Sequence, residues 1–244
     1  MSDEKKKMTE GNCAICGRFG KLSFEHVPPQ SAFNDRPIFV QNHTHLTDEN
    51  SPLHGKKAKS NKGFGGYTLC ISCNNLTGDW YARDFGTFAH QGMAIISNIQ
   101  EPQYYITGEY FIKPLNVIKQ IMTMFMSADK SGILQSQSDL VRLLLDRESN
   151  LWPERYKIFL YSNLSSVKRL WGYSVVFDEE LGMQKWSEIN FRPFGYLLAD
   201  ESIAAHEDML DITYFSRYEY NQDATLILRT PYLPVSSPEL GRYG

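Results

Sequence analysis

The stretches Cys13-Ala-Ile-Cys16 and Cys70-Ile-Ser-Cys73 decide the fold of the first part of this chain. In each pair two residues separate the cysteines, which is the spacing with which a short turn places two thiolates on one zinc ion. Four thiolates complete a tetrahedral site and leave no open coordination position. The sequence therefore predicts one structural zinc that closes a long loop and takes no part in catalysis.

Redox chemistry is the alternative use of these cysteines. Thioredoxin-like motifs share the spacing, but they follow a strand and open a helix within a βαβ pattern, which neither pair shows. A redox switch that uses either pair stays open as the weaker hypothesis.

The predicted zinc site brings together the segments that follow the two cysteine pairs. Phe24-Glu25-His26 follows the first pair, and Asn74 directly follows Cys73. These segments supply a carboxylate and an amide as oxygen ligands for a hard cation, and an imidazole as a base. Asn74 also suits the N-cap of a helix, and Asn75 or Asp79 could replace it as a ligand.

This arrangement resembles the HNH endonuclease family in its zinc-stabilised ββα-metal form, over roughly residues 13 to 85. The resemblance implies that His26 is the general base that activates water. It implies that Glu25, where the family usually has Asp, and Asn74 hold a catalytic divalent ion, Mg²⁺ or Mn²⁺. It also implies a structural Zn²⁺ on the four cysteines, which are Cys13, Cys16, Cys70 and Cys73.

The chain departs from the family in one place. Many members have an Asn a few residues before the third cysteine that ties down the loop, whereas residues 62–67 read KGFGGY here. Asn61 is the nearest candidate, but its register is wrong. The sequence therefore leaves the loop-orienting residue unassigned.

The implied activity is metal-dependent hydrolysis of phosphodiester bonds, with DNA favoured over RNA as the substrate. Four lysines within a short acid-free stretch are candidates for binding the substrate backbone, namely Lys56, Lys57, Lys59 and Lys62. A homodimer would let one site per chain cut both strands. The alternative function is a zinc-knuckle module that binds nucleic acid, or regulates, without cleavage.

Composition limits the other function classes. The chain has 244 residues, of which 42% are hydrophobic and 22% charged, and this is typical of a globular protein. Its net charge of -3 gives no global sign of nucleic-acid binding, so any such surface must be local. The chain has no run of about eighteen apolar residues and no apolar stretch after its start, which favours a cytoplasmic protein without membrane contact.

The fold class predicted is α+β in three parts. Residues 1–90 form the HNH nuclease domain, residues 91–150 a helical connecting region, and residues 151–244 an antiparallel β-rich domain. Because a nuclease inside a cell needs restraint, we expect this last part to take a regulatory ligand or protein partner, in a role such as defence against phage DNA. The periodicities predict helices at 74–90, 114–127 and 139–147, the last with a Ser136–Asp139 capping box, a long loop at 42–66, and strands at 67–69, 156–161, 170–177, 189–198, 212–220 and 224–229.

Overall fold

The N-terminal cysteine pair stands at the edge of a three-stranded antiparallel sheet in the computed structural model, which describes residues 9–42, 45, 48–100, 103–179, 182–200 and 209–233. The sheet has the order β1-β2-β5, formed by Glu10–Asn12, Phe19–His26 and Gly65–Cys70. Helix α2, Ile71–Thr77, begins directly after β5. The short strand predicted at 67–69 is confirmed and is longer than predicted.

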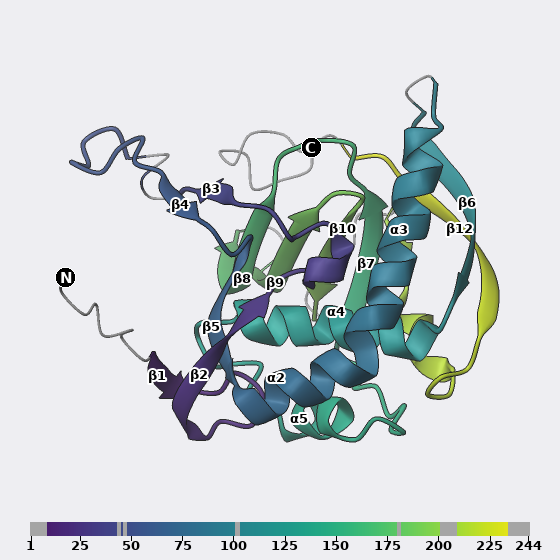
Figure 1. Cartoon of the computed structure of the whole chain (residues 1–244), viewed down its shortest axis with the longest axis horizontal. Coiled ribbons are helices and arrows are strands. Elements are labelled where there is room, and N and C mark those ends of the chain that lie inside the picture. The colour runs from purple at the N-terminus through teal and green to yellow at the C-terminus, as the bar shows by residue number, and fades with distance from the viewer. Residues whose placement is uncertain are drawn as a thin grey trace, which may run out of the picture.

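The long connection between β2 and β5 leaves the body of the molecule and returns. It passes through a single turn of 3-10 helix, Gln30–Ala32, and then through strands β3, Ile38–Val40, and β4, Ala58–Ser60. These two strands pair as an antiparallel hairpin that projects outward (Figure 1). The segment predicted as a loop at 42–66 therefore contains a strand.

A long helical path follows the second cysteine pair. Helix α2 continues through a π turn, Gly78–Ala82, into α3, Arg83–Ser97. The helix predicted at 74–90 is confirmed, and it runs on through the boundary expected near residue 90. Phe88 of α3 stacks on Phe194 at 4.5 Å between ring centroids, and a side chain at Gly92 would collide with the same ring.

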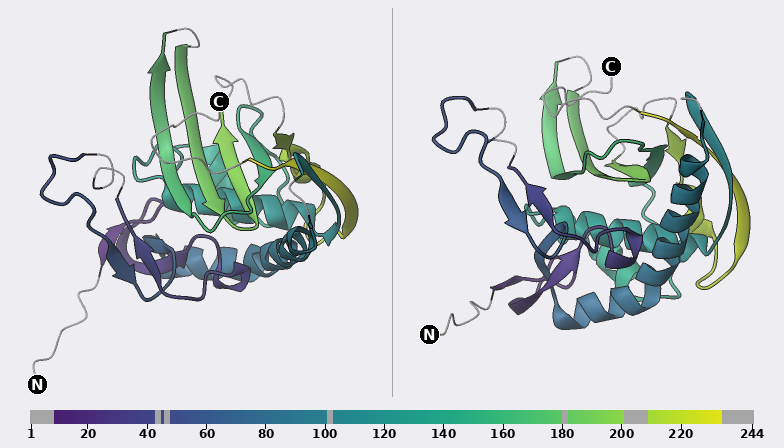
Figure 2. Two further views of the ribbon diagram at one scale, coloured as in Figure 1. Left: turned by 90° about the horizontal axis from the view of Figure 1, so that it is seen from above. Right: turned by 45° about the horizontal axis from the view of Figure 1, so that its top comes forward.

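Helix α4, Pro114–Ala128, is buried along its whole length and lies at the centre of the fold (Figure 2). Its Pro occupies the first turn as predicted, where a missing N–H has no cost. The buried Lys119 ammonium donates to the carbonyls of Asp146 and Arg147 at 2.8 and 3.0 Å. It thereby satisfies carbonyls just beyond the end of α5, Ser138–Leu145.

The capping box predicted for α5 is wrong. The N-cap is Gln137, and no side chain caps the helix there. The Ser136 hydroxyl donates to the Ile133 carbonyl instead, and the Asp139 carboxylate accepts from Arg155 at 2.7 Å. The Asp139 carboxylate also accepts from the Leu140 N–H at 2.8 Å, while the Ser136 N–H that a capping box would use already donates to the Gly132 carbonyl at 3.0 Å.

The C-terminal part forms a five-stranded antiparallel sheet that packs on α4. The segment predicted as one strand at 189–198 is two strands joined by a tight turn. The strand predicted at 212–220 is wrong, because a 3-10 helix, Thr213–Arg217, occupies it and the Asp211 carboxylate accepts from its first N–H. The order is β11-β7-β10-β9-β8, formed by Leu210–Asp211, Lys157–Ser162, Phe194–Ala199, Gly182–Phe191 and Arg169–Asp178.

A separate two-stranded ribbon runs beside α3 (Figures 1 and 2). It pairs β6, Tyr105–Ile112, with β12, Ala224–Pro231, of which only β12 was predicted. Gly108 lies in the middle of β6 where the Ile95 side chain of α3 packs against the strand. One continuous hydrophobic core joins all three predicted parts, from Cys13 to Leu228. The class is mixed α+β, as predicted, and none of the helices in the described ranges is long and apolar enough to cross a membrane.

Candidate functional site

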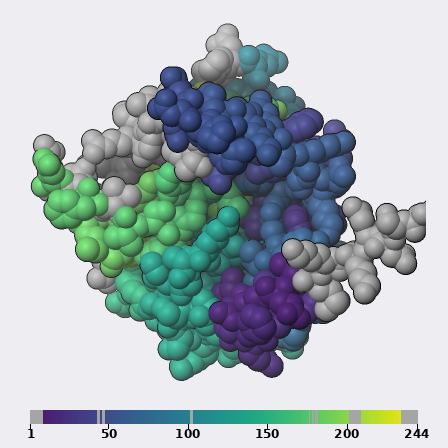
Figure 3. All heavy atoms as spheres, turned by 90° about the vertical axis from the view of Figure 1, so that its left-hand side faces the viewer, coloured from purple at the N-terminus to yellow at the C-terminus, as the bar shows by residue number. Residues whose placement is uncertain are grey.

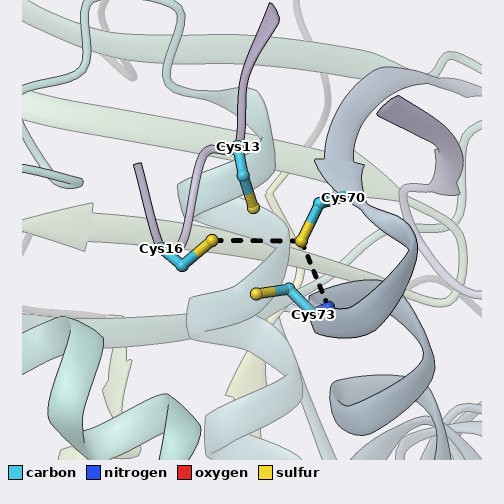
Figure 4. A group of neighbouring side chains, drawn as sticks. All are labelled: Cys13, Cys16, Cys70 and Cys73. Atoms are coloured by element: carbon cyan, nitrogen blue, oxygen red, sulfur yellow. Dashed lines mark hydrogen bonds between the residues drawn. The ribbon is translucent and has the colours of Figure 1, made fainter. Parts of the chain in front are cut away.

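The four cysteine sulfurs converge on one point (Figure 4). All four lie within 4.8 Å of one another, and the Sγ atoms of Cys16 and Cys70 are 3.9 Å apart. Thiolates bound at about 2.3 Å to one tetrahedral ion would lie about 3.8 Å apart. The cluster is therefore compatible with a structural zinc, as the spacing predicted.

Different local structures present the two cysteine pairs. Gly17 adopts a left-handed conformation, which lets the chain turn back so that its N–H donates to the Cys13 carbonyl at 2.9 Å. Cys70 is the N-cap of α2, and its sulfur accepts from the Cys73 N–H at 3.5 Å. A hairpin turn and a helix N-terminus thus face each other, and the latter favours negative charge on sulfur.

The environment of the sulfurs favours a bound cation. The hydrogen bond that the Cys73 thiol donates to the Cys13 sulfur, together with burial, raises the pKa of Cys73, so several thiolates there cannot coexist without a compensating charge. A hydrogen bond with Cys16 raises the pKa of the Arg18 guanidinium at the rim of the cluster. The donor set and the charge both fit a divalent ion bound by four thiolates.

Glu25 and His26 end strand β2 and point to opposite faces of it, because side chains alternate along a strand. His26 shares a face with Phe24, whose ring lies 4.9 Å away in a T-shaped contact. Glu25 shares the other face with Ser23. The sequence predicted the pair as neighbours, and the strand assigns each residue to its own side.

Asn74 of α2 docks onto the Glu25 side of β2. Its amide nitrogen donates to the Ser23 hydroxyl at 3.0 Å and to the Phe24 carbonyl at 3.2 Å. Both bonds use the nitrogen, whereas a metal ion would bind the amide oxygen. The predicted substitutes Asn75 and Asp79 are both exposed.

The Glu25 carboxyl is buried without compensation. Its exposed fraction is 7%, and desolvation by burial raises its pKa to about 8, with no hydrogen bond or charge among the described residues to offset it. The position directly opposite on β5 is Gly66, and a methyl group there would meet only Thr68, at 3.5 Å. A glycine in a strand often marks close approach by a ligand. The strand beside this carboxyl therefore leaves room next to it.

The His26 ring is held as a neutral base. It makes a hydrogen bond to the Lys62 backbone, while its Nε2 is buried without a hydrogen-bond partner in the described structure. Burial, with the Lys62 charge as a smaller cause, lowers the pKa of the imidazole. One ring nitrogen therefore donates to a carbonyl and leaves the other as a proton acceptor at neutral pH.

Asn34 is a site residue that the sequence analysis missed. It is 1% exposed, and its side chain makes three hydrogen bonds of 2.7 Å, to the Pro28 carbonyl and to the carbonyl and N–H of Phe64. These bonds join the chain leaving β2 to the chain entering β5. In the sequence, the glycine at position 63 is the feature that points to Asn34, because a Cβ at Gly63 would lie 2.6 Å from Asn34 oxygens.

The four predicted lysines are not equivalent. Lys56, Lys57 and Lys59 are exposed on the projecting hairpin and its loop, which overhang the face viewed in Figure 3. Lys62 lies in the turn between β4 and β5, and its backbone bonds the His26 ring. The structure therefore brings Lys62 to the candidate site and places the other three on the hairpin.

No family model, no curated protein and no solved structure matches this chain.

Replacing Glu25 with Gln is expected to stabilise the protein at neutral pH by about 3 kcal/mol when no divalent metal is added. The carboxyl has a pKa of 4.5 when unperturbed and about 8 in the folded protein. The free-energy cost of ionising the buried carboxyl is absent below pH 4.5 and grows as the pH rises toward the folded-state pKa of about 8.

Thermal denaturation from acidic to mildly alkaline pH measures this effect. The wild type should lose stability across that range relative to the Glu25→Gln variant. Glu109→Gln, at an exposed carboxyl, is the control and should follow the wild type. Parallel pH profiles for the wild type and Glu25→Gln would contradict the prediction.

Proposed function

We propose that this chain is a metal-dependent HNH endonuclease that hydrolyses phosphodiester bonds, in DNA more than in RNA. The observation that supports the proposal is that three groups lie on or against the end of β2, Glu25 and Asn74 on one face and His26 on the other. Glu25 supplies a buried carboxyl that has no hydrogen bond or opposite charge among the described residues. Asn74 supplies an amide docked on the same strand. His26 supplies an imidazole whose Nε2 has no hydrogen-bond partner among the described residues. Carboxylate, amide and base are the groups that such hydrolysis requires.

In the proposed mechanism His26 accepts a proton from water, and the resulting hydroxide attacks phosphorus in line with the leaving oxygen. The carbonyl of Lys62 holds the imidazole in the tautomer that can accept this proton. Glu25 and the Asn74 amide oxygen would hold Mg²⁺ or Mn²⁺. When bound, the cation would supply the positive charge that stabilises the phosphate and its leaving oxygen.

The proposed structural zinc supports this site from a distance. Cys73 precedes Asn74, and Cys70 ends the strand that pairs with β2. A zinc ion on the four cysteines would therefore fix α2 against β2 and hold Asn74 beside the Glu25 strand. We assign no chemical step to this ion, since four thiolates close its coordination sphere.

Cleavage of supercoiled plasmid tests the proposal. We expect nicked or linear product with Mg²⁺ or Mn²⁺, and none with EDTA after a brief exposure that leaves the zinc content unchanged. Asn74→Ala should lower the rate about tenfold or more, through loss of a metal ligand. The adjacent Asn75→Ala is the matched control and should cut as the wild type does, because that side chain is exposed.

A module that binds nucleic acid without cutting it is the second candidate. The two hydrogen bonds of Asn74 favour it, because they dock α2 on β2 whether or not a metal is present. This candidate predicts DNA binding that His26→Ala leaves unchanged and no cleavage under any metal condition. Intact DNA and RNA with every divalent ion tested would replace the nuclease proposal with this one.

A further inference from the structure

The Lys62 ammonium is held in a defined place by aromatic side chains. Its Nζ donates to the Tyr67 hydroxyl at 2.7 Å. It also lies over the Phe24 ring, 5.2 Å from the centroid, and over the Tyr67 ring at 4.9 Å. Cation–π contacts of this kind restrain a side chain that is otherwise flexible.

The same aromatic wall supports His26. Phe24 makes T-shaped contacts with His26 at 4.9 Å and with Tyr67 at 5.5 Å. Phe24 and Tyr67 pair directly across β2 and β5, so they share one face of the sheet. The ammonium and the imidazole therefore lie on the same face, with the Phe24 ring in contact with both.

The ammonium keeps its capacity to bind an anion. Lys62 and Tyr67 are exposed, the tyrosine to 42%. Among the ion pairs of the described residues, none involves Lys62. A lysine has three N–H donors, and the Tyr67 hydroxyl takes one of them. A restrained cation without a carboxylate partner loses little side-chain entropy on binding a phosphate.

We propose that Lys62 binds a backbone phosphate of a nucleic-acid strand on the His26 face of the site, and that Tyr67 is its positioning residue. This inference rests on the proposed function, since it concerns the strand to be cut. The exposed lysines of the hairpin, Lys56, Lys57 and Lys59, then contribute only diffuse charge.

Fluorescence anisotropy of a fluorescein-labelled DNA duplex, without divalent metal so that no cutting occurs, tests the inference. Lys62→Gln should weaken binding about tenfold. It should also make the negative slope of log K against log salt shallower by about 0.9, as for one lost phosphate contact. Tyr67→Phe should weaken binding about threefold without changing the slope, because the charge remains. Lys57→Gln is the matched control and should change binding less than twofold, about the limit of a surface charge effect.

The outcomes separate this inference from the proposed function. Tight binding that depends on Lys62, with no cleavage when Mg²⁺ is added, would uphold the phosphate contact and overturn the nuclease. Equal effects of Lys62→Gln and Lys57→Gln would overturn the contact even if the protein cuts. Absence of duplex binding by the wild type would overturn it as well. Matching melting temperatures and zinc contents establish that each variant is folded.

Discussion

Replacing His26 with alanine should lower the rate of metal-dependent plasmid cleavage by about 10³-fold, as expected for loss of a general base. In the proposed mechanism this imidazole accepts a proton from water, because its buried Nε2 has no hydrogen-bond partner among the described residues while the ring bonds the Lys62 backbone. Initial rates with saturating Mg²⁺ measure the effect. Free imidazole added to the buffer should restore part of the lost rate, because it can enter the space left by the ring.

His54→Ala is the control for the His26 variant. Its ring also contacts a backbone carbonyl, that of Asp48 at 3.1 Å, but it is exposed on the long connection between β2 and β5. It should cut at the wild-type rate. A His26→Ala variant that cuts as fast as His54→Ala would assign the base to another group.

Loss of the zinc ion proposed at the four cysteines should unfold the protein. Binding free energies of structural zinc are about 10 kcal/mol or more. The whole stability of a domain is about 5–15 kcal/mol. Cys13 and Cys73 are both buried in the core that also contains Leu115 of α4, so the effect should extend beyond the N-terminal strands. We expect Cys73→Ser to lower the melting temperature by tens of degrees, or to abolish folding.

Metal analysis and thermal denaturation check the zinc prediction. The wild type should contain one zinc per chain, and strong chelators should remove it together with the folded signal. Ser72→Ala is the matched control, because Ser72 is exposed between the two cysteines of the second pair and should retain both zinc and stability. If the wild type is purified without zinc and the Cys73→Ser variant melts at the same temperature, the zinc prediction is wrong and the redox hypothesis for these cysteines is favoured.

Local patterns predicted much of this fold. The apolar spacing of residues 114–127 gave α4 nearly to the residue, and the two-residue cysteine spacing anticipated the sulfur cluster. Both signals arise from neighbours in the sequence. Strand β6 was missed because Gly108 interrupts its pattern, and its partner strand β12 lies more than a hundred residues further along the chain.

At the candidate site, too, contacts between sequence neighbours were predicted and contacts between distant segments were not. Adjacency along the chain predicted Glu25 and His26 together and placed Asn74 near them. The loop-tying Asn34 was sought in the wrong segment, because its bonds to Pro28 and Phe64 depend on how the long connection returns. The difference between Lys62 and the other lysines could not be predicted either, since it depends on a turn that brings one backbone carbonyl to a histidine ring.

Helix α3 has a consequence for how such a protein can be inherited. It is the last part of the helical path that begins at the cysteine cluster, and it places Phe88 against Phe194 of the C-terminal sheet. A gene fragment that ended near residue 90 would therefore encode half of this helix and an aromatic surface without its cover. The N-terminal part transplanted alone would expose Phe88 to water, so the N-terminal part and the C-terminal sheet depend on each other for the core between them.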